Sequence, residues 1–367
     1  MVYLALSGGG TGGHFYPLLA FAKYLKRKQT PFEGLIFFGD QRGIEFKRKN
    51  LIEETFDRHF FLSMGKFKGY STLRVLVSTL KTLRASFEIA KHLKGKRFVA
   101  LTFGGYTSAP LGFLCGVKKA PLFVHEQNAI PGMGNRFLSR IARKVFITFP
   151  HSERYFPKKK VVLTGLPLRE ELKEAKKLSE EEVLKTLGWE KKFTVTVLGG
   201  SQGAKTLNRL AVKLSTLLSE EIRLVHVSGE RNYKETLEEY KKVNPKCEVR
   251  VYPFYEDIGK LLRVTDLAIS RAGASSSMEL SYFGVPAIFV PYPYAVYNHQ
   301  EENARYFVKG GGAYLLREEQ LSPQKVRDIV LNHFRDTSLG KQMGEAMERL
   351  FIPNAEEKIL SHLLEVI

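Results

Sequence analysis

The chain has 367 residues, more than one hydrophobic core usually serves, so its length favours two domains. Its hydrophobic content of 44% and charged content of 26% are those of a folded protein and exclude an intrinsically disordered chain. The net charge of +19 indicates an anionic partner: nucleic acid, an acidic membrane surface or a phosphorylated substrate.

Three sequence features are missing, and their absence limits the class of protein further. Cys115 and Cys247 lie far apart and outside any Cys-x-x-Cys pattern, so no zinc site is expected. The strand-like residues 2–6 lack the basic start and long apolar run of a signal peptide. No segment approaches the ~20 apolar residues of a membrane span. We therefore expect a soluble cytoplasmic protein, or one that lies on a membrane surface.

Short apolar strands alternate with amphipathic helical patterns along the chain. We expect strands at 2–6, 34–39, 97–102, 121–125, 144–148, 161–164, 193–198, 222–227, 248–251, 266–270 and 286–291. We expect helices at 16–28, 72–94, 134–142, 178–187, 205–219, 232–242 and 277–283. This alternation is typical of parallel βαβ units and predicts an α/β fold.

A glycine-rich turn follows the first strand of each half. Residues 7–13 read Ser-Gly-Gly-Gly-Thr-Gly-Gly, and residues 199–203 read Gly-Gly-Ser-Gln-Gly. Such strand-to-helix turns predict two Rossmann-like domains with parallel sheets, at 1–165 and 166–353. We expect the closing helix at 354–367 to cross back to the first domain, after the interruption at Pro353.

The first turn has the spacing of a phosphate-binding loop. Gly8, Gly10 and Gly13 satisfy G-x-G-x-x-G, where glycines allow a tight turn and close approach of a phosphate to the backbone. Amides at the start of the next helix would then face the anion. Asp40, at the end of the next strand, stands near the place of the acidic residue of a dehydrogenase, so a nicotinamide enzyme remains an alternative on this turn alone.

The second half has a nucleotide-binding pattern of a different kind. After the strand at 266–270, glycine turns the chain, Ser275 and Ser276 offer caps and hydroxyl donors, and Glu279 follows in the early helix. There its carboxylate is placed to accept both hydroxyls of a ribose. A plain serine cap with an acidic residue favoured by the helix dipole remains the alternative.

Polar residues also follow two strands of the first half. One group is the turn at 103–108, and the other is His125, Glu126, Gln127 and Asn128. His14, directly after the first glycine turn, is the best candidate for a general base, because a histidine near its ordinary pKa of about 6.5 can accept a hydroxyl proton. Glu126 is the next candidate. Local backbone capping by His14 remains the alternative.

Segment 66–97 combines an apolar stripe with basic residues, and Glu88 is its only acid. The stripe has helical spacing and comprises Leu73, Val77, Leu80, Leu83 and Phe87. The basic residues include Lys66, Lys68, Arg74 and Lys81. The pattern predicts an anchor on anionic lipid, extended by an apolar turn at 111–117. Packing of the whole stripe on the sheet is the alternative.

Several motifs, in order and along nearly the whole chain, resemble the MurG family of bacterial N-acetylglucosaminyltransferases. They are Gly-Gly-Gly-Thr-Gly-Gly-His at 8–14 with Pro17, His-Glu-Gln-Asn at 125–128, Thr-Gly-Leu-Pro-Leu-Arg at 164–169, Gly-Gly-Ser-Gln-Gly-Ala at 199–204, the stretch from Arg271 to Glu279, and Gln300 with Asn303 and Ala304. The resemblance implies the GT-B fold, in which two Rossmann-like domains face a cleft.

The resemblance also implies roles for individual residues. The donor-binding residues would be Thr11, Gly12, Gly13, Asn128, Arg169, Ser201, Tyr255 through its backbone, Ala274, Ser275, Ser276, Glu279 and Gln300. Whether His299 or Gln300 meets the sugar stays open. The first glycine turn suits the diphosphate of the acceptor, which we expect at Gly9, Gly10, Gly104 and Tyr106.

The activity implied is transfer of N-acetylglucosamine, with inversion, from its UDP donor to the C4 hydroxyl of undecaprenyl-diphospho-N-acetylmuramoyl-pentapeptide. We expect no cofactor, and no metal, since no Asp-x-Asp pair is present. The expected partners are these two substrates and an anionic membrane surface, not nucleic acid, at the cytoplasmic face of the bacterial plasma membrane. The alternatives are another glycolipid transferase, a UDP-sugar 2-epimerase and a non-catalytic nucleotide-binding membrane adaptor.

Overall fold

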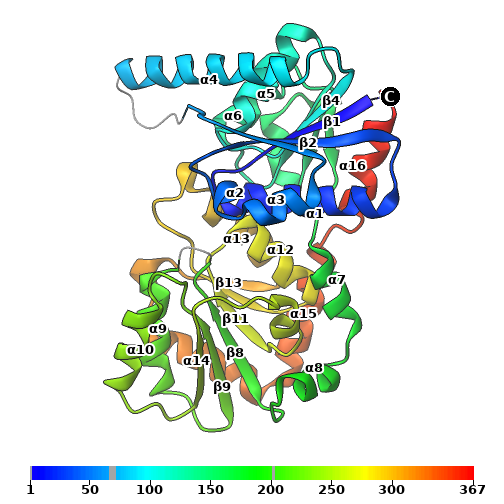
Figure 1. Cartoon of the computed structure of the whole chain (residues 1–367). Coiled ribbons are helices and arrows are strands. Elements are labelled where there is room, and N and C mark those ends of the chain that lie inside the picture. The colour runs from blue at the N-terminus through cyan, green and yellow to red at the C-terminus, as the bar shows by residue number, and fades with distance from the viewer. Residues whose placement is uncertain (1, 66–71, 201–202) are drawn as a thin grey trace. The chain divides into compact units, whose positions relative to one another are not determined.

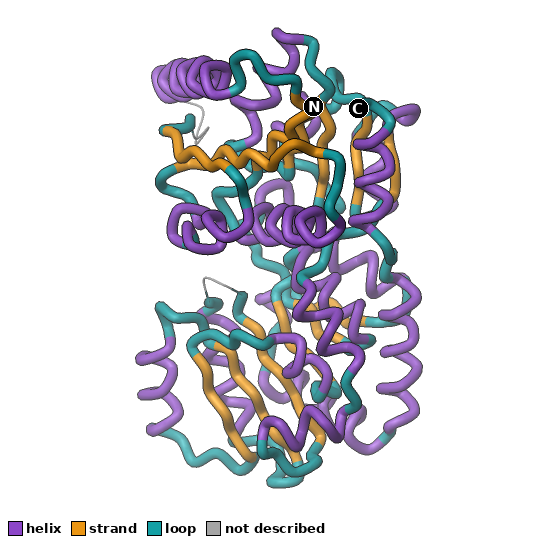
Figure 2. The backbone as a smooth tube through the Cα atoms, turned by 45° about the vertical axis from the view of Figure 1, so that its right-hand side comes forward, coloured by secondary structure: helices purple, strands orange, loops and turns teal. Residues whose placement is uncertain are grey.

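The computed structural model describes residues 2–65, 72–200 and 203–367. Contacts between residues divide the chain into two compact units, Met1–Arg169 with Ile352–Ile367, and Glu170–Phe351. Each unit holds one parallel sheet with helices packed against it, as Figures 1 and 2 show. The predicted α/β class, with two domains built on parallel sheets, is confirmed.

The sheet of the first unit has seven described strands in the order β3-β2-β1-β4-β5-β6-β7. Their bounds are β1 (Val2–Ser7), β2 (Phe32–Asp40), β3 (Arg58–Leu62), β4 (Phe98–Thr102), β5 (Leu122–Glu126), β6 (Lys144–Ile147) and β7 (Val161–Leu163). All neighbouring strands run parallel. The inner strands are buried on both faces, which explains their nearly continuous apolar sequences.

Helices cover both faces of this sheet. They are α1 (Gly12–Lys28), α2 (Ile44–Lys47), α3 (Lys49–Thr55), α4 (Thr72–His92), α5 (Ser108–Lys118), α6 (Met133–Leu138) and α16 (Ala355–Leu364), with short 3-10 turns at Pro150–Tyr155 and Lys158–Lys160. One apolar core joins α1, α3 and α16 to the sheet, and a second joins α4, α5 and α6. In Figure 1 these two sets lie on opposite sides of β1, β2 and β4.

The second unit has six described strands in the order β10-β9-β8-β11-β12-β13. They are β8 (Phe193–Leu198), β9 (Ile222–Val227), β10 (Glu248–Tyr252), β11 (Leu267–Ser270), β12 (Ala287–Phe289) and β13 (Ala313–Leu315). Its helices are α7 (Glu170–Lys177), α8 (Glu180–Leu187), α9 (Lys205–Ser215), α10 (Tyr233–Lys241), α11 (Ile258–Arg263), α12 (Ala274–Phe283), α13 (His299–Lys309), α14 (Pro323–Arg335) and α15 (Thr337–Leu350), with 3-10 turns at Val296–Asn298 and Glu318–Gln320. Helices α9 and α14 share the main apolar core of the sheet.

Several elements differ from the sequence-based expectation. The strands β3 and β13 were not expected, because β13 has only three residues, Ala313–Leu315, and β3 begins with the polar pair Arg58 and His59. Helix α1 begins at Gly12 rather than at residue 16, which places His14 in its first turn. The prediction of a turn at 111–117 is wrong. These residues form most of α5, and Leu111, Leu114 and Cys115 are buried at helical spacing. Among the described residues, none of the helices is both long and apolar enough to cross a membrane.

Candidate active site

The register of the first sheet brings the polar segments of the first unit to one edge. Ser7 lies beside Phe38 and Thr102, and Glu126 lies beside Ile147. The strands therefore end at a similar level, and the glycine turn, the turn after Thr102 and residues 125–128 follow at the same edge. In open α/β sheets this carboxyl edge is where ligands bind.

His14 begins a chain of hydrogen bonds that crosses this edge. Its Nδ1 lies 2.8 Å from Oε1 of Gln127, and Nε2 of Gln127 lies 3.0 Å from Nδ1 of His125. Nε2 of His125 lies 3.0 Å from the carbonyl oxygen of Gly165. A carbonyl only accepts, so His125 donates through Nε2, Gln127 donates to His125, and His14 donates through Nδ1. This order leaves Nε2 of neutral His14 as a proton acceptor.

Burial makes the neutral form of His14 the favoured one. It lowers the pKa of His14, while the hydrogen bonds to Gln127 and to the backbone of Phe103 act in the opposite direction and do not cancel it. Burial also lowers the pKa of His125, to about 4, and its ring stacks on Phe103 at 5.0 Å between ring centres. Both imidazoles are therefore neutral near pH 7, as the hydrogen-bond chain requires.

Glu126 is held differently from His14. Its Oε1 accepts the backbone N–H of Asn128 at 2.9 Å, and its Oε2 accepts Nδ2 of Asn135 at 2.8 Å. The carboxylate is 1% exposed. Because both oxygens are bonded inside the fold, the geometry favours a role in positioning Asn128 over proton transfer by Glu126.

The first glycine turn is closely packed on its inner side. An added Cβ would lie 2.7 Å from Cβ of Phe103 at Gly8, 2.5 Å from Cδ of Glu45 at Gly9, and 2.6 Å from the ring of Tyr106 at Gly10. The amide of Gly10 donates to Oε2 of Glu45 at 2.9 Å. A carboxylate of the protein therefore holds the amide of Gly10 in this structure, and contact of Gly10 with the acceptor diphosphate stays a prediction.

The start of α1 provides other donors a few residues further on. Its N-cap, Thr11, makes no side-chain capping bond, and the first amides of any helix lack partners within the helix. Gly12, Gly13 and His14 lie in this first turn, where the helix dipole also favours an anion, and the N–H of His14 already donates to the carbonyl of Thr11 at 3.3 Å. The turn of Gly104 and Gly105, both at positive φ, packs against His14 and Gly9.

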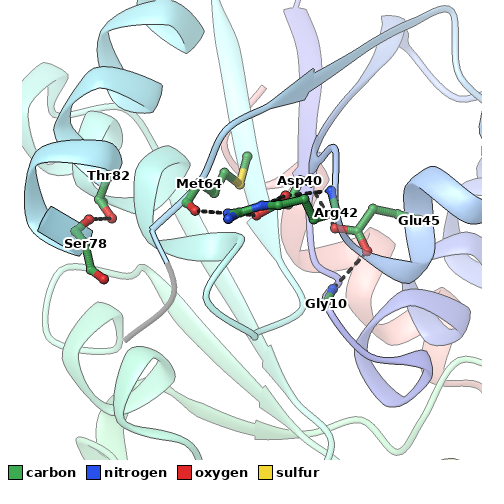
Figure 3. A network of polar contacts seen from close by, with 7 residues as sticks. All are labelled: Gly10, Asp40, Arg42, Glu45, Met64, Ser78 and Thr82. Carbon is green, nitrogen blue, oxygen red and sulfur yellow. Dashed lines mark hydrogen bonds and ion pairs between the residues drawn. The ribbon is translucent and has the colours of Figure 1, made fainter. Parts of the chain in front are cut away.

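Asp40 does not have the environment of a ribose-binding acid. It is fully buried, and Arg42 donates to both of its oxygens, from Nε at 3.2 Å and from Nη2 at 3.0 Å, as Figure 3 shows. Burial, with the negative charges of Asp40 and Glu45, raises the pKa of the neighbouring Tyr106. This arrangement argues against the nicotinamide alternative, which needs Asp40 to face a nucleotide.

In the second unit, strand register again gathers the predicted residues at one edge. Leu198 lies beside Val227 and Ser270, Val227 beside Tyr252, and Ser270 beside Phe289. The second glycine turn, Tyr255 and the start of α12 follow directly. Ser201, predicted to bind the donor, lies outside the described residues.

The start of α12 has the features of an anion site. Its N-cap is Gly273, which has no side chain to satisfy the first amides, and Ala274, Ser275 and Ser276 form its first turn. Within the described part of the chain, the hydroxyls of Ser275 and Ser277 are buried without a hydrogen-bond partner. A buried hydroxyl normally has a partner, so these donors are suited to a bound phosphate. Glu279 is half-buried in the second turn of the same helix.

The remaining predicted donor residues lie on well-supported segments. Oε1 of Gln300 accepts the N–H of Tyr292 at 2.9 Å, and Nδ1 of His299 lies 2.8 Å from the carbonyl of Val296, so both side chains are anchored and the choice between them stays a prediction. Burial raises the pKa of Tyr255 to about 12. Arg169 lies in the first unit, 5.7 Å from the ring centre of Tyr16.

Four residues support these sites: the sequence named Arg271 and Asn303 only as parts of motifs, and it did not indicate Asn135 or Glu45. Arg271 donates to the carbonyls of Val290 and Pro291 and pairs with Glu318, so it holds the turn before α12 rather than a ligand. Asn303 donates to the carbonyl of Ala272 at 3.0 Å. Asn135 and Glu45 are the corresponding supports in the first unit. The motifs did not indicate which groups these residues bind, because hydrogen-bond partners depend on how separate segments pack.

Helix α4 presents its apolar stripe outward. Val77 and Leu83 are each 42% exposed, Leu80 is 57% exposed and Phe87 is 65% exposed, while Ala85 and Ile89 fill the core. The alternative that this stripe packs on the sheet is therefore wrong for these four residues. Exposed Phe113 and Val117 of α5, with Lys118 and Lys119, lie on the helix that packs beside α4. Lys66 and Lys68 lie outside the described residues, as do the side chains of Leu73 and Arg74.

The sequence matches two domain families, and it is similar over nearly its whole length to proteins whose function is named. Residues 4–147 match the glycosyltransferase family 28 N-terminal domain, and residues 194–359 match the glycosyltransferase family 28 C-terminal domain. A protein of Aquifex aeolicus (strain VF5) is 42% identical over 366 residues, which are 98% of this chain and 99% of that protein. Its name is UDP-N-acetylglucosamine–N-acetylmuramyl-(pentapeptide) pyrophosphoryl-undecaprenol N-acetylglucosamine transferase.

Solved structures agree with these matches. The crystal structure of Acinetobacter baumannii MurG superposes with a TM-score of 0.75 at 27% identity and covers 99% of both chains. The UDP-GlcNAc 2-epimerase of Neisseria meningitidis, bound to UDP-GlcNAc, superposes with a TM-score of 0.69 and covers 100% of both chains. At 13% identity the second likeness shows a common fold alone.

Proposed function

The chain belongs to the MurG family, with the two domains of glycosyltransferase family 28 and the GT-B fold, and from this membership we propose how it carries out its reaction. It transfers N-acetylglucosamine from UDP-N-acetylglucosamine to the C4 hydroxyl of undecaprenyl-diphospho-N-acetylmuramoyl-pentapeptide, the last step in making the lipid-linked precursor of peptidoglycan. The 42% identity to a full-length relative with this name supports the reaction.

The second unit binds the donor. The start of α12 holds the diphosphate through its free amides and the hydroxyls of Ser275 and Ser276, and stabilises the charge that develops on UDP as it leaves. Glu279, about one turn after Ser275 on the same helix, accepts the ribose hydroxyls. Gln300 or His299 contacts the sugar. The buried hydroxyl of Ser275, which has no hydrogen-bond partner among the described residues, supports this assignment.

The first unit binds the acceptor and activates it. The resemblance assigned Gly12 and Gly13 to the donor, but their amides lie at the start of α1 beside His14, in the first unit and not with α12 in the second, so here they hold the acceptor diphosphate. Nε2 of His14 takes the proton of the C4 hydroxyl as its oxygen forms a bond to the anomeric carbon. The bond from that carbon to the UDP oxygen breaks on the other face, which inverts the configuration. The observation that carries this role is the hydrogen-bond chain from His14 to Gly165, which fixes the basic nitrogen.

The exposed face of α4 is the membrane-binding surface. It consists of Leu76, Val77, Leu80, Leu83 and Phe87, with Lys81, Arg84 and Lys91 on the same helix. An exposed apolar stripe beside cations suits an anionic lipid surface, where the apolar side chains can enter the hydrocarbon region. Binding to a nucleic acid depends on contacts between cations and phosphates and would leave these apolar side chains in water. The acceptor carries an undecaprenyl chain, so we place the enzyme peripherally on the cytoplasmic face of the bacterial plasma membrane.

Release of UDP, measured with and without a muramoyl-diphospho-lipid, tests the reaction. We expect release to depend on the acceptor and to yield a disaccharide product. Hydrolysis of the donor at the same rate without acceptor would instead support a 2-epimerase type of activity. No turnover under either condition would support a nucleotide-binding adaptor.

Flotation with vesicles containing anionic lipid tests the membrane surface. Each exposed CH₂ group buried in lipid contributes ~0.8 kcal/mol, so replacing Leu80 and Phe87 by Ser should abolish most of the binding. The matched control is Leu364→Ser, since Leu364 is 40% exposed on α16, which packs on the opposite face of the sheet. Both variants should turn over a water-soluble acceptor normally. Full vesicle binding by the α4 variant would exclude this surface.

A further inference from the structure

Glu45 is a buried carboxylate directly behind the first glycine turn. Its side chain is fully buried, although it belongs to the short helix α2 in the connection after β2. Oε2 accepts the N–H of Gly10 at 2.9 Å, and Oε1 accepts the N–H of Asp40 at 3.0 Å, as Figure 3 shows. A charge buried in this way is tolerated only because hydrogen bonds replace water.

The turn is shaped around this carboxylate. A Cβ on Gly9 would lie 2.5 Å from Cδ of Glu45, and a side chain on Gly43 would overlap the same carboxylate. Gly10 itself has φ of +79°, a conformation that glycine adopts at no steric cost. The Gly9-Gly10 pair is therefore needed for contact with Glu45 as well as for the turn.

A second contact group holds the end of β2, to which Glu45 is attached. Arg42 binds both oxygens of Asp40 and donates from Nη2 to the carbonyl of Met64 at 2.6 Å. The next residue, Gly65, lies against the carbonyl of Ser78 in α4. Figure 3 shows the contacts from Gly10 through Glu45, Asp40 and Arg42 to Met64, with the separate Ser78–Thr82 pair of α4 on the far side of Met64. The backbone around Glu45 is thus braced, and the carboxylate has little freedom to leave Gly10.

We propose that Glu45 is a positioning residue of the acceptor site. By holding the Gly10 amide on the inner side of the turn, it fixes the path of the chain into Thr11 and presents the first amides of α1, together with His14, to the acceptor diphosphate. Glu45 does not touch the substrate. This proposal rests on the proposed function, since it concerns how the acceptor is bound.

Two variants separate anchoring from charge. Glu45→Gln keeps the size but has one acceptor oxygen for two amides, and its own NH₂ faces a donor. Glu45→Asp keeps the charge but is shorter by one CH₂ and cannot reach both amides. The matched control is Glu54→Gln, because Glu54 is an exposed residue on the adjacent helix α3.

Steady-state kinetics should show the effect on one substrate only. With a water-soluble muramoyl diphosphate acceptor, we expect kcat/KM for the acceptor to fall by about tenfold or more in both Glu45 variants, as for loss of a charge-assisted hydrogen bond. The KM for UDP-N-acetylglucosamine should change far less, since the start of α12 and Glu279, which we propose hold the diphosphate and ribose of the donor, lie in the other unit. Glu54→Gln should behave as the wild type.

Hydrogen exchange provides a readout that does not depend on turnover. A peptide spanning residues 8–14 should exchange faster in both Glu45 variants than in the wild type, because the Gly10 amide loses its acceptor. A peptide from β8 should be unchanged, which checks that the variants remain folded.

The outcomes distinguish failure of this proposal from failure of the proposed function. An inactive but folded wild-type enzyme would contradict the function. An active wild type with unchanged acceptor kinetics in Glu45→Gln, or with unchanged exchange in the turn, would overturn the positioning role. Wild-type behaviour of Glu45→Asp beside a defective Glu45→Gln would also overturn it, because charge alone would then suffice.

Discussion

At His14, two properties needed for proton transfer occur together. The hydrogen bond to Gln127 fixes the ring and leaves Nε2 as the acceptor, and burial lowers the pKa, so that the neutral base is present near pH 7. The sequence indicated the residue type and its place beside the glycine turn. It did not indicate Gln127, His125 and Gly165 as successive supports, because that chain depends on side-chain orientation.

The pH profile of the acceptor reaction should reflect this lowered pKa. Protonation inactivates the base, so kcat/KM should fall as the pH decreases through the pKa of His14, below its ordinary value of about 6.5. His14→Ala should lower kcat by roughly 10²–10⁴-fold, with UDP affinity unchanged and without this acid limb. An acid limb centred above pH 6.5, or a loss of kcat below tenfold, would point to another base.

Glu279 provides the corresponding test at the donor. Glu279→Ala should weaken binding of UDP-N-acetylglucosamine by the ~1.5–3 kcal/mol of a charge-assisted hydrogen bond, about a tenfold to hundredfold increase in donor KM. The acceptor KM and the melting temperature should change little. Glu302→Ala, at a partly exposed acid on α13, is a suitable control. An unchanged donor KM in Glu279→Ala would remove the ribose assignment.

In α4, the spacing of apolar residues predicted the helix correctly but could not show whether its apolar stripe is buried or exposed. The three-and-four spacing of apolar residues predicted a helix over 72–94, and α4 spans Thr72–His92. The same spacing was compatible with packing or with exposure. The neighbouring helix decided this point: α4 packs on α5 through its Ala85–Ser86 side, where Ser86 donates to the carbonyl of Pro110 at 3.0 Å, and the stripe faces away.

Helix α15 allows a matched test of close packing behind the donor site. A Cβ on Gly344 would lie 2.5 Å from the carbonyl oxygen of Gly284, which ends α12, whereas a Cβ on Gly340 would meet only ordinary contacts. Gly344→Ala should therefore destabilise the protein by about 1–3 kcal/mol. Gly340→Ala should stabilise it by up to about 1 kcal/mol through helix propensity. Chemical denaturation measures both, and equal effects would contradict the close contact.

For the whole molecule, the last helix belongs to the first unit. Ile359 and Leu363 of α16 are fully buried in the core formed with β1 and α1, although nearly the whole chain separates them in sequence. Glu356 of the same helix accepts the amide of Leu168 at 3.0 Å. The first unit is therefore complete only after the second has been synthesised.

Because α16 packs in the core of the first unit, a cavity created in α16 should destabilise that unit and not the second. Ile359→Ala should destabilise by about 2–5 kcal/mol, as for other large-to-small changes in a core. Hydrogen exchange should quicken in β1 and α1 while β8 and β9 keep their protection, because the two units have separate cores. Equal loss of protection in both units would mean that they unfold as one.

The sequence by itself determined the features that depend on local periodicity and on motifs. Strand–helix alternation predicted two parallel α/β domains, and the glycine turns, residues 125–128 and the stretch from Arg271 to Glu279 indicated the site and the family. These signals are readable because the residues concerned are near one another in the chain. The strands β3 and β13 lacked such a signal, since β13 is three residues long and β3 opens with two polar residues.

Only the tertiary structure decided which groups meet. It placed Glu45 against Gly9 and Gly10, so that a carboxylate of the protein accepts the amide of Gly10 inside the predicted phosphate-binding turn. It also linked His14 to Gly165 and turned the apolar stripe of α4 outward. Each of these outcomes depends on contacts between distant segments. Hydrogen-bond partners and burial are set by how those segments pack, and no local pattern of residues encodes that packing.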